Sequence, residues 1–154
     1  MQIRPRRDGD LPALVEHLRA THARDAYPVR PENARAGWLT EHRGPAWVAD
    51  DGGAAVGHVA LDVPPEEGAP AEVVRLFLAP AARGRGLATA LLDHATAHAR
   101  TAGRDVVLQV MAHNADAVAL YERRGWRRTG QEDAAWAAEA GLPQVTTYWY
   151  VPPA

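Results

Sequence analysis

Two arginines and two glycines alternate in a short segment whose residue types suit the binding of an anion. Arg83, Gly84, Arg85 and Gly86 lie between a branched apolar run and a run of leucine and alanine at helical spacing. The first turn of a helix leaves backbone N–H groups without partners, and the helix dipole favours negative charge there. Glycine lets a phosphate approach those groups closely, and arginine adds charge-assisted hydrogen bonds. The segment therefore predicts an anion site at the start of a helix.

Other phosphate-binding motifs do not match this segment. The dinucleotide motif needs a third glycine where Thr89 stands. The Walker motif needs a lysine, and all 17 basic residues of the chain are arginine. The lack of lysine also removes Schiff-base chemistry, and the lack of cysteine removes thiol nucleophiles and disulfides. A nucleotide-binding domain is an alternative hypothesis, which would require ATP or NAD to bind.

The elements expected around the segment are those of one α/β domain that covers residues 1–154. Strands are predicted at residues 2–6, 46–49, 55–63, 73–79, 105–111, 126–129 and 145–151. Helices are predicted after a cap at Asp8 or Asp10 and at residues 33–43, 86–103 and 114–124, and an alanine-rich loop is predicted before the last strand. This order predicts a mixed central sheet of six to seven strands with helices on both faces.

Two motifs resemble those of one enzyme family. Residues 83–88 resemble the Gln/Arg-x-x-Gly-x-Gly/Ala signature of the GCN5-related N-acetyltransferases (GNAT). Residues 114–126 resemble the family's Asn-x-x-Ala…Leu-Tyr-x-x-x-Gly-Phe segment, with Trp126 in place of the phenylalanine. Asn114 and Tyr121 are seven residues apart, so a helix would place them on one side. By these motifs the chain is identified as a member of the GNAT family, with the resemblance strongest over residues 72–126.

The resemblance implies a single-domain GNAT fold with a splayed central strand pair, acetyl-CoA as co-substrate, and specific roles for residues of both motifs. Tyr121 is expected to protonate the departing thiolate, and the backbone N–H of Leu78 is expected to stabilise the oxyanion. No metal and no covalent enzyme intermediate are expected. The cofactor-binding residues implied are Leu76, Leu78, Arg83, Gly84, Arg85, Gly86, Leu87, Ala88, Asn114 and Tyr121.

The general base that deprotonates the attacking amine is less well determined. Glu72 is the first candidate, because it precedes Leu78 by six residues and shares its face of the strand if no bulge intervenes. Glu72 also matches the catalytic glutamate of the histone-acetylating members of the family. His58, His113 and a chain of water molecules are the alternatives. His94 and His98 have the spacing of a metal pair, but the sequence offers no third ligand beside them.

The acceptor is expected to be a primary amine of a small molecule or a peptide, bordered by residues 22–32. That segment contains both carboxylates and arginines, so cationic and acidic acceptors stay open. Nucleic-acid and membrane partners are not expected, because the net charge is −2 and no apolar run reaches the length of a membrane span. A cytoplasmic location is expected, and a homodimer could use an exposed last strand. The alternative function is a non-catalytic acyl-CoA-binding sensor or interaction module.

Overall fold

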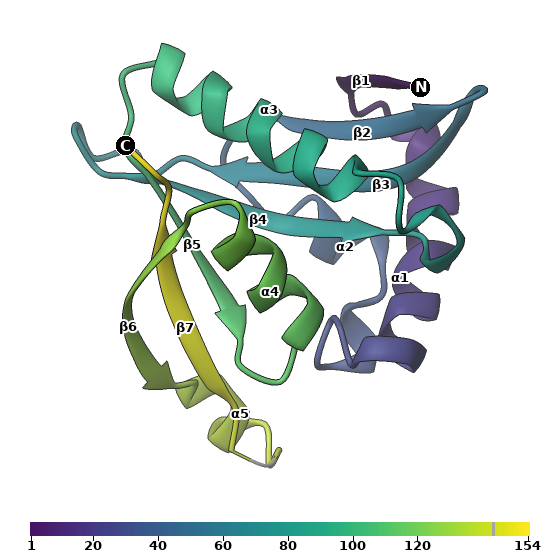
Figure 1. Ribbon diagram of the computed structural model, residues 1–154. Coiled ribbons are helices and arrows are strands. Elements are labelled where there is room, and N and C mark those ends of the chain that lie inside the picture. Colours follow the sequence, from purple (N-terminus) through teal and green to yellow (C-terminus); the bar gives the residue numbers. More distant parts are fainter. Residues whose placement is uncertain (143) are drawn as a thin grey trace. The chain divides into compact units, whose positions relative to one another are not determined.

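A computed structural model describes residues 1–142 and 144–154, which form two compact units, Met1–Asp105 (unit 1) and Val106–Ala154 (unit 2). Unit 1 contains four strands, two longer helices and several short helical turns (Figure 1). Its elements are β1 (Gln2–Pro5), η1 (Asp8–Asp10), α1 (Leu11–Asp25), η2 (Pro31–Asn33), α2 (Ala36–Leu39), β2 (Ala46–Asp51), β3 (Ala54–Asp62), β4 (Ala71–Leu78), η3 (Pro80–Ala82) and α3 (Leu87–Thr101).

The sheet of unit 1 is antiparallel, in the order β1-β2-β3-β4. Its pairing is regular except for two shifts of register. One of them lies between β3 and β4, where His58 pairs with Phe77 whereas Ala60 pairs with Val74. Two steps along β3 therefore oppose three along β4, which defines a β-bulge at residues 75–76.

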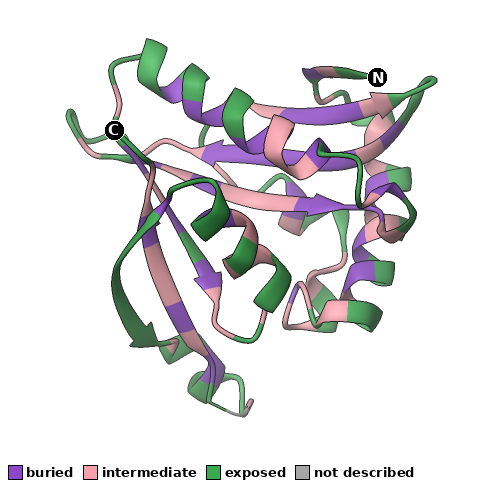
Figure 2. Ribbon diagram, in the orientation of Figure 1, coloured by how far each residue is buried: buried purple, intermediate pink, exposed green. Residues whose placement is uncertain are grey.

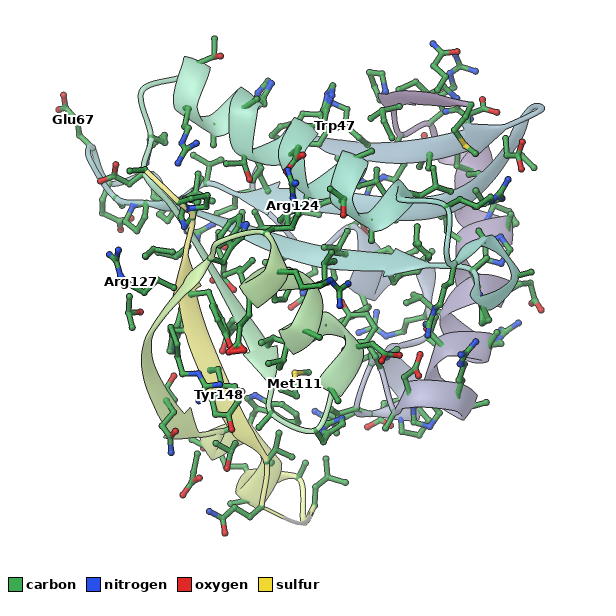
Figure 3. The ribbon with its side chains drawn as sticks, in the orientation of Figure 1. Trp47, Glu67, Met111, Arg124, Arg127 and Tyr148 are labelled. Carbon is green, nitrogen blue, oxygen red and sulfur yellow. The ribbon has the colours of Figure 1, made fainter. Side chains whose placement is uncertain are left out.

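Helices cover both faces of this sheet, as predicted. On one face α1 and α2 bury an apolar cluster that includes Leu14, Leu18 and Phe77. Burying a side chain of that size contributes roughly 1.5–3 kcal/mol. On the other face α3 covers Trp47 of β2, whose ring contacts His94 and His98 at 5.1 and 5.0 Å between centroids (Figure 3).

Unit 2 consists of a three-stranded antiparallel sheet and two helices: β5 (Val106–Met111), α4 (Ala115–Arg123), β6 (Arg127–Asp133), α5 (Ala135–Glu139) and β7 (Thr146–Val151). β7 pairs with β5 on one side and with β6 on the other. The rings of Tyr121, Trp126 and Tyr150 form its aromatic centre, and all three are buried. β6 is exposed along its whole length (Figure 2).

All seven predicted strands and the helices at residues 86–103 and 114–124 are confirmed within a few residues at their ends. The helix predicted at 33–43 is wrong in extent, since only one α-helical turn forms at Ala36–Leu39. The alanine-rich loop prediction missed α5; residue 143 of that stretch lies outside the described residues. The last strand is not an exposed edge, because it is paired on both sides. No described helix is both long enough and apolar enough to cross a bilayer.

Candidate active site

The turn before α3 exposes a series of backbone donors. No acceptor within the described part of the chain takes the N–H groups of residues 84–89; the first bond of the helix runs from Ala90 N–H to the Gly86 carbonyl. Gly84 and Gly86 have φ angles of 83° and 75°, a region that glycine enters without steric cost. A Cβ at either position would meet no atom within 4 Å, so open space lies over the turn. Open backbone donors beneath open space are the arrangement that accommodates a phosphate group.

Both arginines of the turn are paired with carboxylates of unit 1. Arg83 Nη2 lies 2.5 Å from Asp25 Oδ2, at the end of α1, and both side chains are largely covered. Arg85 Nη1 lies 3.1 Å from Asp51 Oδ2, at the β2–β3 turn, and that pair is exposed. The backbone N–H of Arg83 donates to the Pro80 carbonyl. Arg83 therefore differs from the residues after it, because its main-chain donor is already used.

The register of β4 shows where the backbone of Leu78 points. Ala79 N–H donates to the Val56 carbonyl at 2.8 Å, which marks 56 and 79 as a hydrogen-bonded pair. Hydrogen-bonded and non-hydrogen-bonded pairs alternate along an antiparallel ladder, and Gly57 pairs with Leu78 in the next position. The N–H of Leu78 therefore points away from β3. An N–H group that points away from the neighbouring strand can donate a hydrogen bond to a developing oxyanion, which is the role expected of Leu78.

The bulge in β4 is held from β3 by His58. Arg75 adopts φ +55°, which is strained for a residue with a Cβ, and its carbonyl lies 2.8 Å from His58 Nδ1. The imidazole also stacks on Phe77 at 5.5 Å. The Arg75 guanidinium reaches back to the Trp38 carbonyl and lies 4.0 Å from the Trp38 ring. These contacts fix the conformation of β4 just before Leu78.

The protonation of His58 follows from its partners. Arg6 Nη1 lies 3.0 Å from Nε2, and a guanidinium only donates hydrogen bonds, so Nε2 must be the acceptor and Nδ1 carries the proton. Burial lowers the pKa of His58 to about 3, and the nearby cations act in the same direction. His58 is fully buried, and the lone pair of its neutral ring already accepts a hydrogen bond from Arg6.

Glu72 does not share a face with Leu78, which corrects the expectation from residue spacing. The bulge intervenes, and the register pairs Glu72 with Asp62 on the face that carries His58 and Phe77. Leu78 pairs with Gly57 and points to the opposite face, toward Leu91 of α3. Glu72 thus faces the side of the sheet that α1 and α2 cover.

The segment expected to border the acceptor begins at the end of α1. The Tyr27 ring packs against Trp38 at 5.8 Å and against Phe77 at 6.5 Å. Burial raises the pKa of Tyr27 to about 12, so its hydroxyl stays protonated at neutral pH. The charges of the segment pair with arginines, Glu32 with Arg30 at 2.8 Å and Asp25 with Arg83. Tyr27 and Trp38 therefore place aromatic rings over the face of the sheet on which Glu72 lies.

Unit 2 carries the second motif. Asn114 caps α4, and its side chain accepts from the Ala117 N–H at 3.4 Å. Tyr121 lies on the buried side of α4, where its ring contacts Trp126 and Tyr150. Gly125 ends the helical segment at φ 82°. His113, the other rival base, is exposed just before this helix.

The sequence did not indicate the parts that two residues play in shaping the site. Asp25 meets Arg83 across 58 positions of sequence, and Arg75 forms the bulge although nothing in its residue type indicates a positive φ. His94 and His98 pack on Trp47, and no group of three or more potential metal ligands occurs within residues 1–142 and 144–154.

Comparisons with known proteins identify the family. The family model described as "Acetyltransferase (GNAT) family" matches residues 11–126. N-acetyltransferase family 8 member 2 of Rattus norvegicus is 36% identical over 97 residues, which cover 60% of this chain and 42% of the rat protein. The chain thus matches less than half the length of this curated relative.

Solved structures agree in fold over nearly the whole chain. An N-acetyltransferase from Staphylococcus aureus Mu50 superposes with a TM-score of 0.75 at 18% identity, covering 97% of this chain and 95% of that one. The protein yncA from Salmonella typhimurium, solved with its cofactor acetyl-CoA, gives a TM-score of 0.71 at 20% identity, covering 97% and 91%. These likenesses confirm the predicted α/β fold. With the family model matching most of its length, the chain belongs to the GNAT acetyltransferase family.

Proposed function

We propose that the protein is an N-acetyltransferase that transfers acetyl from acetyl-CoA to a primary amine by direct attack in a ternary complex. The observation that carries the proposal is the turn before α3, where the N–H groups of residues 84–89 face open space in the family's own signature segment. The acceptor is an amine of a small molecule or a peptide. The solved relative that holds acetyl-CoA supports this choice of co-substrate.

The turn has the donors for the diphosphate of acetyl-CoA, and residues from both motifs serve the other parts of the cofactor. Backbone N–H groups of Gly84, Arg85, Gly86, Leu87 and Ala88 are the anion donors, and the arginine side chains Arg83 and Arg85 add positive charge. The backbones of Leu76 and Leu78 pair with the amides of the pantetheine arm. Asn114 contacts the same arm directly or through a water molecule.

The reaction needs a proton acceptor, an oxyanion donor and a proton donor. Glu72 takes the proton of the attacking ammonium, directly or through water, from the sheet face that Tyr27 and Trp38 border. The Leu78 N–H stabilises the oxyanion that forms on the thioester carbonyl. The Tyr121 hydroxyl protonates the thiolate as it leaves. No residue of the chain needs to form a covalent intermediate.

A thiol-release assay with an amine library tests the activity, with Tyr121→Phe as the informative variant. Loss of a positioned general acid lowers turnover by roughly 100- to 10,000-fold. We expect Tyr121→Phe to lose turnover while it still binds acetyl-CoA. Tyr148→Phe is the matched control, because it removes a hydroxyl from a half-buried tyrosine of the same unit. Wild-type protein that binds acetyl-CoA but releases no thiol with any amine would favour the sensor function instead.

We also propose that residues 1–154 act as one domain and that the location is cytoplasmic. The family model spans both units, from residue 11 to residue 126, which supports a single domain. One cooperative unfolding transition, detected equally by probes in each unit, is the expected result. A homodimer stays a prediction, to be tested by sizing chromatography at high protein concentration.

A further inference from the structure

The two arginines of the cofactor turn have unequal partners. The Arg83–Asp25 pair is 2.5 Å long, and its side chains are only 27% and 20% exposed. The Arg85–Asp51 pair is 3.1 Å long, and its side chains are 46% and 44% exposed. Exposed ion pairs contribute little because water screens them and the side chains lose freedom. The chain thus contains a covered pair and an exposed pair on one turn.

Arg83 is attached to the protein at both ends. Its backbone N–H donates to Pro80, and its Nη2 donates to Asp25. Within the described residues no other nitrogen of the Arg83 side chain donates a hydrogen bond, so Nε and Nη1 are still available to an anion. The residues that follow, 84–89, supply the open N–H groups. Arg83 is therefore the last hydrogen-bonded residue of the turn, and the open backbone N–H groups begin at the residue after it.

Asp25 lies at an end of α1 that is closed by several hydrogen bonds. It is the last residue of that helix, which ends because Ala26 adopts φ 53° and donates to the His22 carbonyl. The following residues fold back on the helix, since the Thr21 hydroxyl lies 2.8 Å from the Tyr27 carbonyl and His22 Nδ1 lies 2.7 Å from the Pro28 carbonyl. The backbone that carries Asp25 is thus hydrogen-bonded both to α1 and to the segment that contains Tyr27.

We propose that Asp25 is a positioning residue for the cofactor turn, acting through Arg83. The inference rests on the proposed binding of acetyl-CoA. A carboxylate beside a diphosphate would by itself oppose binding, but Asp25 is neutralised by Arg83 and fixes its guanidinium. The turn is then held in its binding conformation before the cofactor arrives, so less conformational freedom is lost on binding. The same contact ties the turn to α1 and to the segment that borders the acceptor.

The test is a double-mutant cycle on acetyl-CoA affinity, measured by titration calorimetry. Asp25→Ala and Arg83→Met should each weaken binding by roughly 3- to 10-fold, in the lower part of the range over which residues in direct contact couple. The double variant should bind no more weakly than the weaker single variant, because the pair acts as a unit. Asp25→Asn, which keeps an acceptor oxygen, should lie between wild type and Asp25→Ala. Asp51→Ala is the matched control and should bind as wild type does.

Three results would overturn the proposal. If Asp25→Ala binds acetyl-CoA more tightly than wild type, Asp25 competes with the cofactor for Arg83. If the losses of Asp25→Ala and Arg83→Met add fully, the two residues act independently and Asp25 does not act through Arg83. If Asp51→Ala loses as much as Asp25→Ala, the effect is one of general charge. Calorimetric stoichiometry reports the folded fraction separately from Kd, so a variant that folds poorly is recognised. Failure of the proposed function would appear differently, as wild-type protein that does not bind acetyl-CoA.

Discussion

Replacing His58 with glutamine removes a titrating group from the interior of unit 1, and the structure predicts how the pH dependence of stability will change. Glutamine can still donate and accept a hydrogen bond, but it takes up no proton. In the wild-type protein Nε2 accepts from Arg6, and Nδ1 donates to the Arg75 carbonyl at the β4 bulge. Protonation of Nε2 would remove that acceptor and place a second cation beside Arg6, so the folded state resists it.

The sign and size follow from proton linkage. The pKa of His58 falls from 6.5 to about 3 on folding. Between these values the unfolded chain binds more protons than the folded protein, so stability is full above pH 6.5 and falls as the pH is lowered toward 3. When the linkage relation is integrated from pH 7.5 to pH 5, the contribution of His58 alone lowers the free energy of unfolding by about 2 kcal/mol.

Urea unfolding of wild type and His58→Gln at pH 7.5 and pH 5 measures this cost. Every other histidine, including His42 beside Arg6, is present in both proteins, so its contribution largely cancels in the difference. We expect wild type to lose about 2 kcal/mol more than the variant between the two pH values. Equal losses in the two proteins would refute the neutral, Arg6-bound state assigned to His58.

Two further substitutions test the packing and the helix cap. Gly57→Ala would place a Cβ 2.5 Å from Leu78 Cδ2 and 3.1 Å from Leu91 Cδ1, so overpacking should cost roughly 1–3 kcal/mol in urea unfolding; an unchanged midpoint would show that α3 yields freely. Asn114→Ala removes the side chain that accepts from the Ala117 N–H, and a lost cap should cost about 0.5–1 kcal/mol; equal stability would mean that the 3.4 Å contact contributes nothing.

The parts of the fold that were predictable from sequence depend on local signals. The glycines at 84, 86 and 125 indicate left-handed turns because no other residue adopts that conformation cheaply, and all three have positive φ angles. The helices beside them were therefore found. The short α5 was missed although Gly141, at φ 70°, follows it as a stop signal, because five residues are too few to show a helical repeat of apolar side chains.

The parts that were not predictable depend on distant partners. The β4 bulge occurs at an arginine, and His58 stabilises it from 17 positions away. The face occupied by Glu72 depends on that bulge, so counting residues from Leu78 gave the wrong face. The central place of β7 is set by its pairing with both β5 and β6, which spacing along the chain does not reveal.

Titration calorimetry with acetyl-CoA tests the cofactor site most directly, using Gly86→Glu and Gly103→Glu. Gly86 and Gly103 have φ angles of 75° and 76°, and neither has an atom within 4 Å of a built Cβ, so the two substitutions carry similar backbone strain, roughly 1–2 kcal/mol. Only Gly86→Glu adds a carboxylate where the diphosphate is expected. We predict that wild type and Gly103→Glu bind acetyl-CoA and that Gly86→Glu does not. Undiminished binding by Gly86→Glu, or no binding by wild type, would contradict the assignment of the turn.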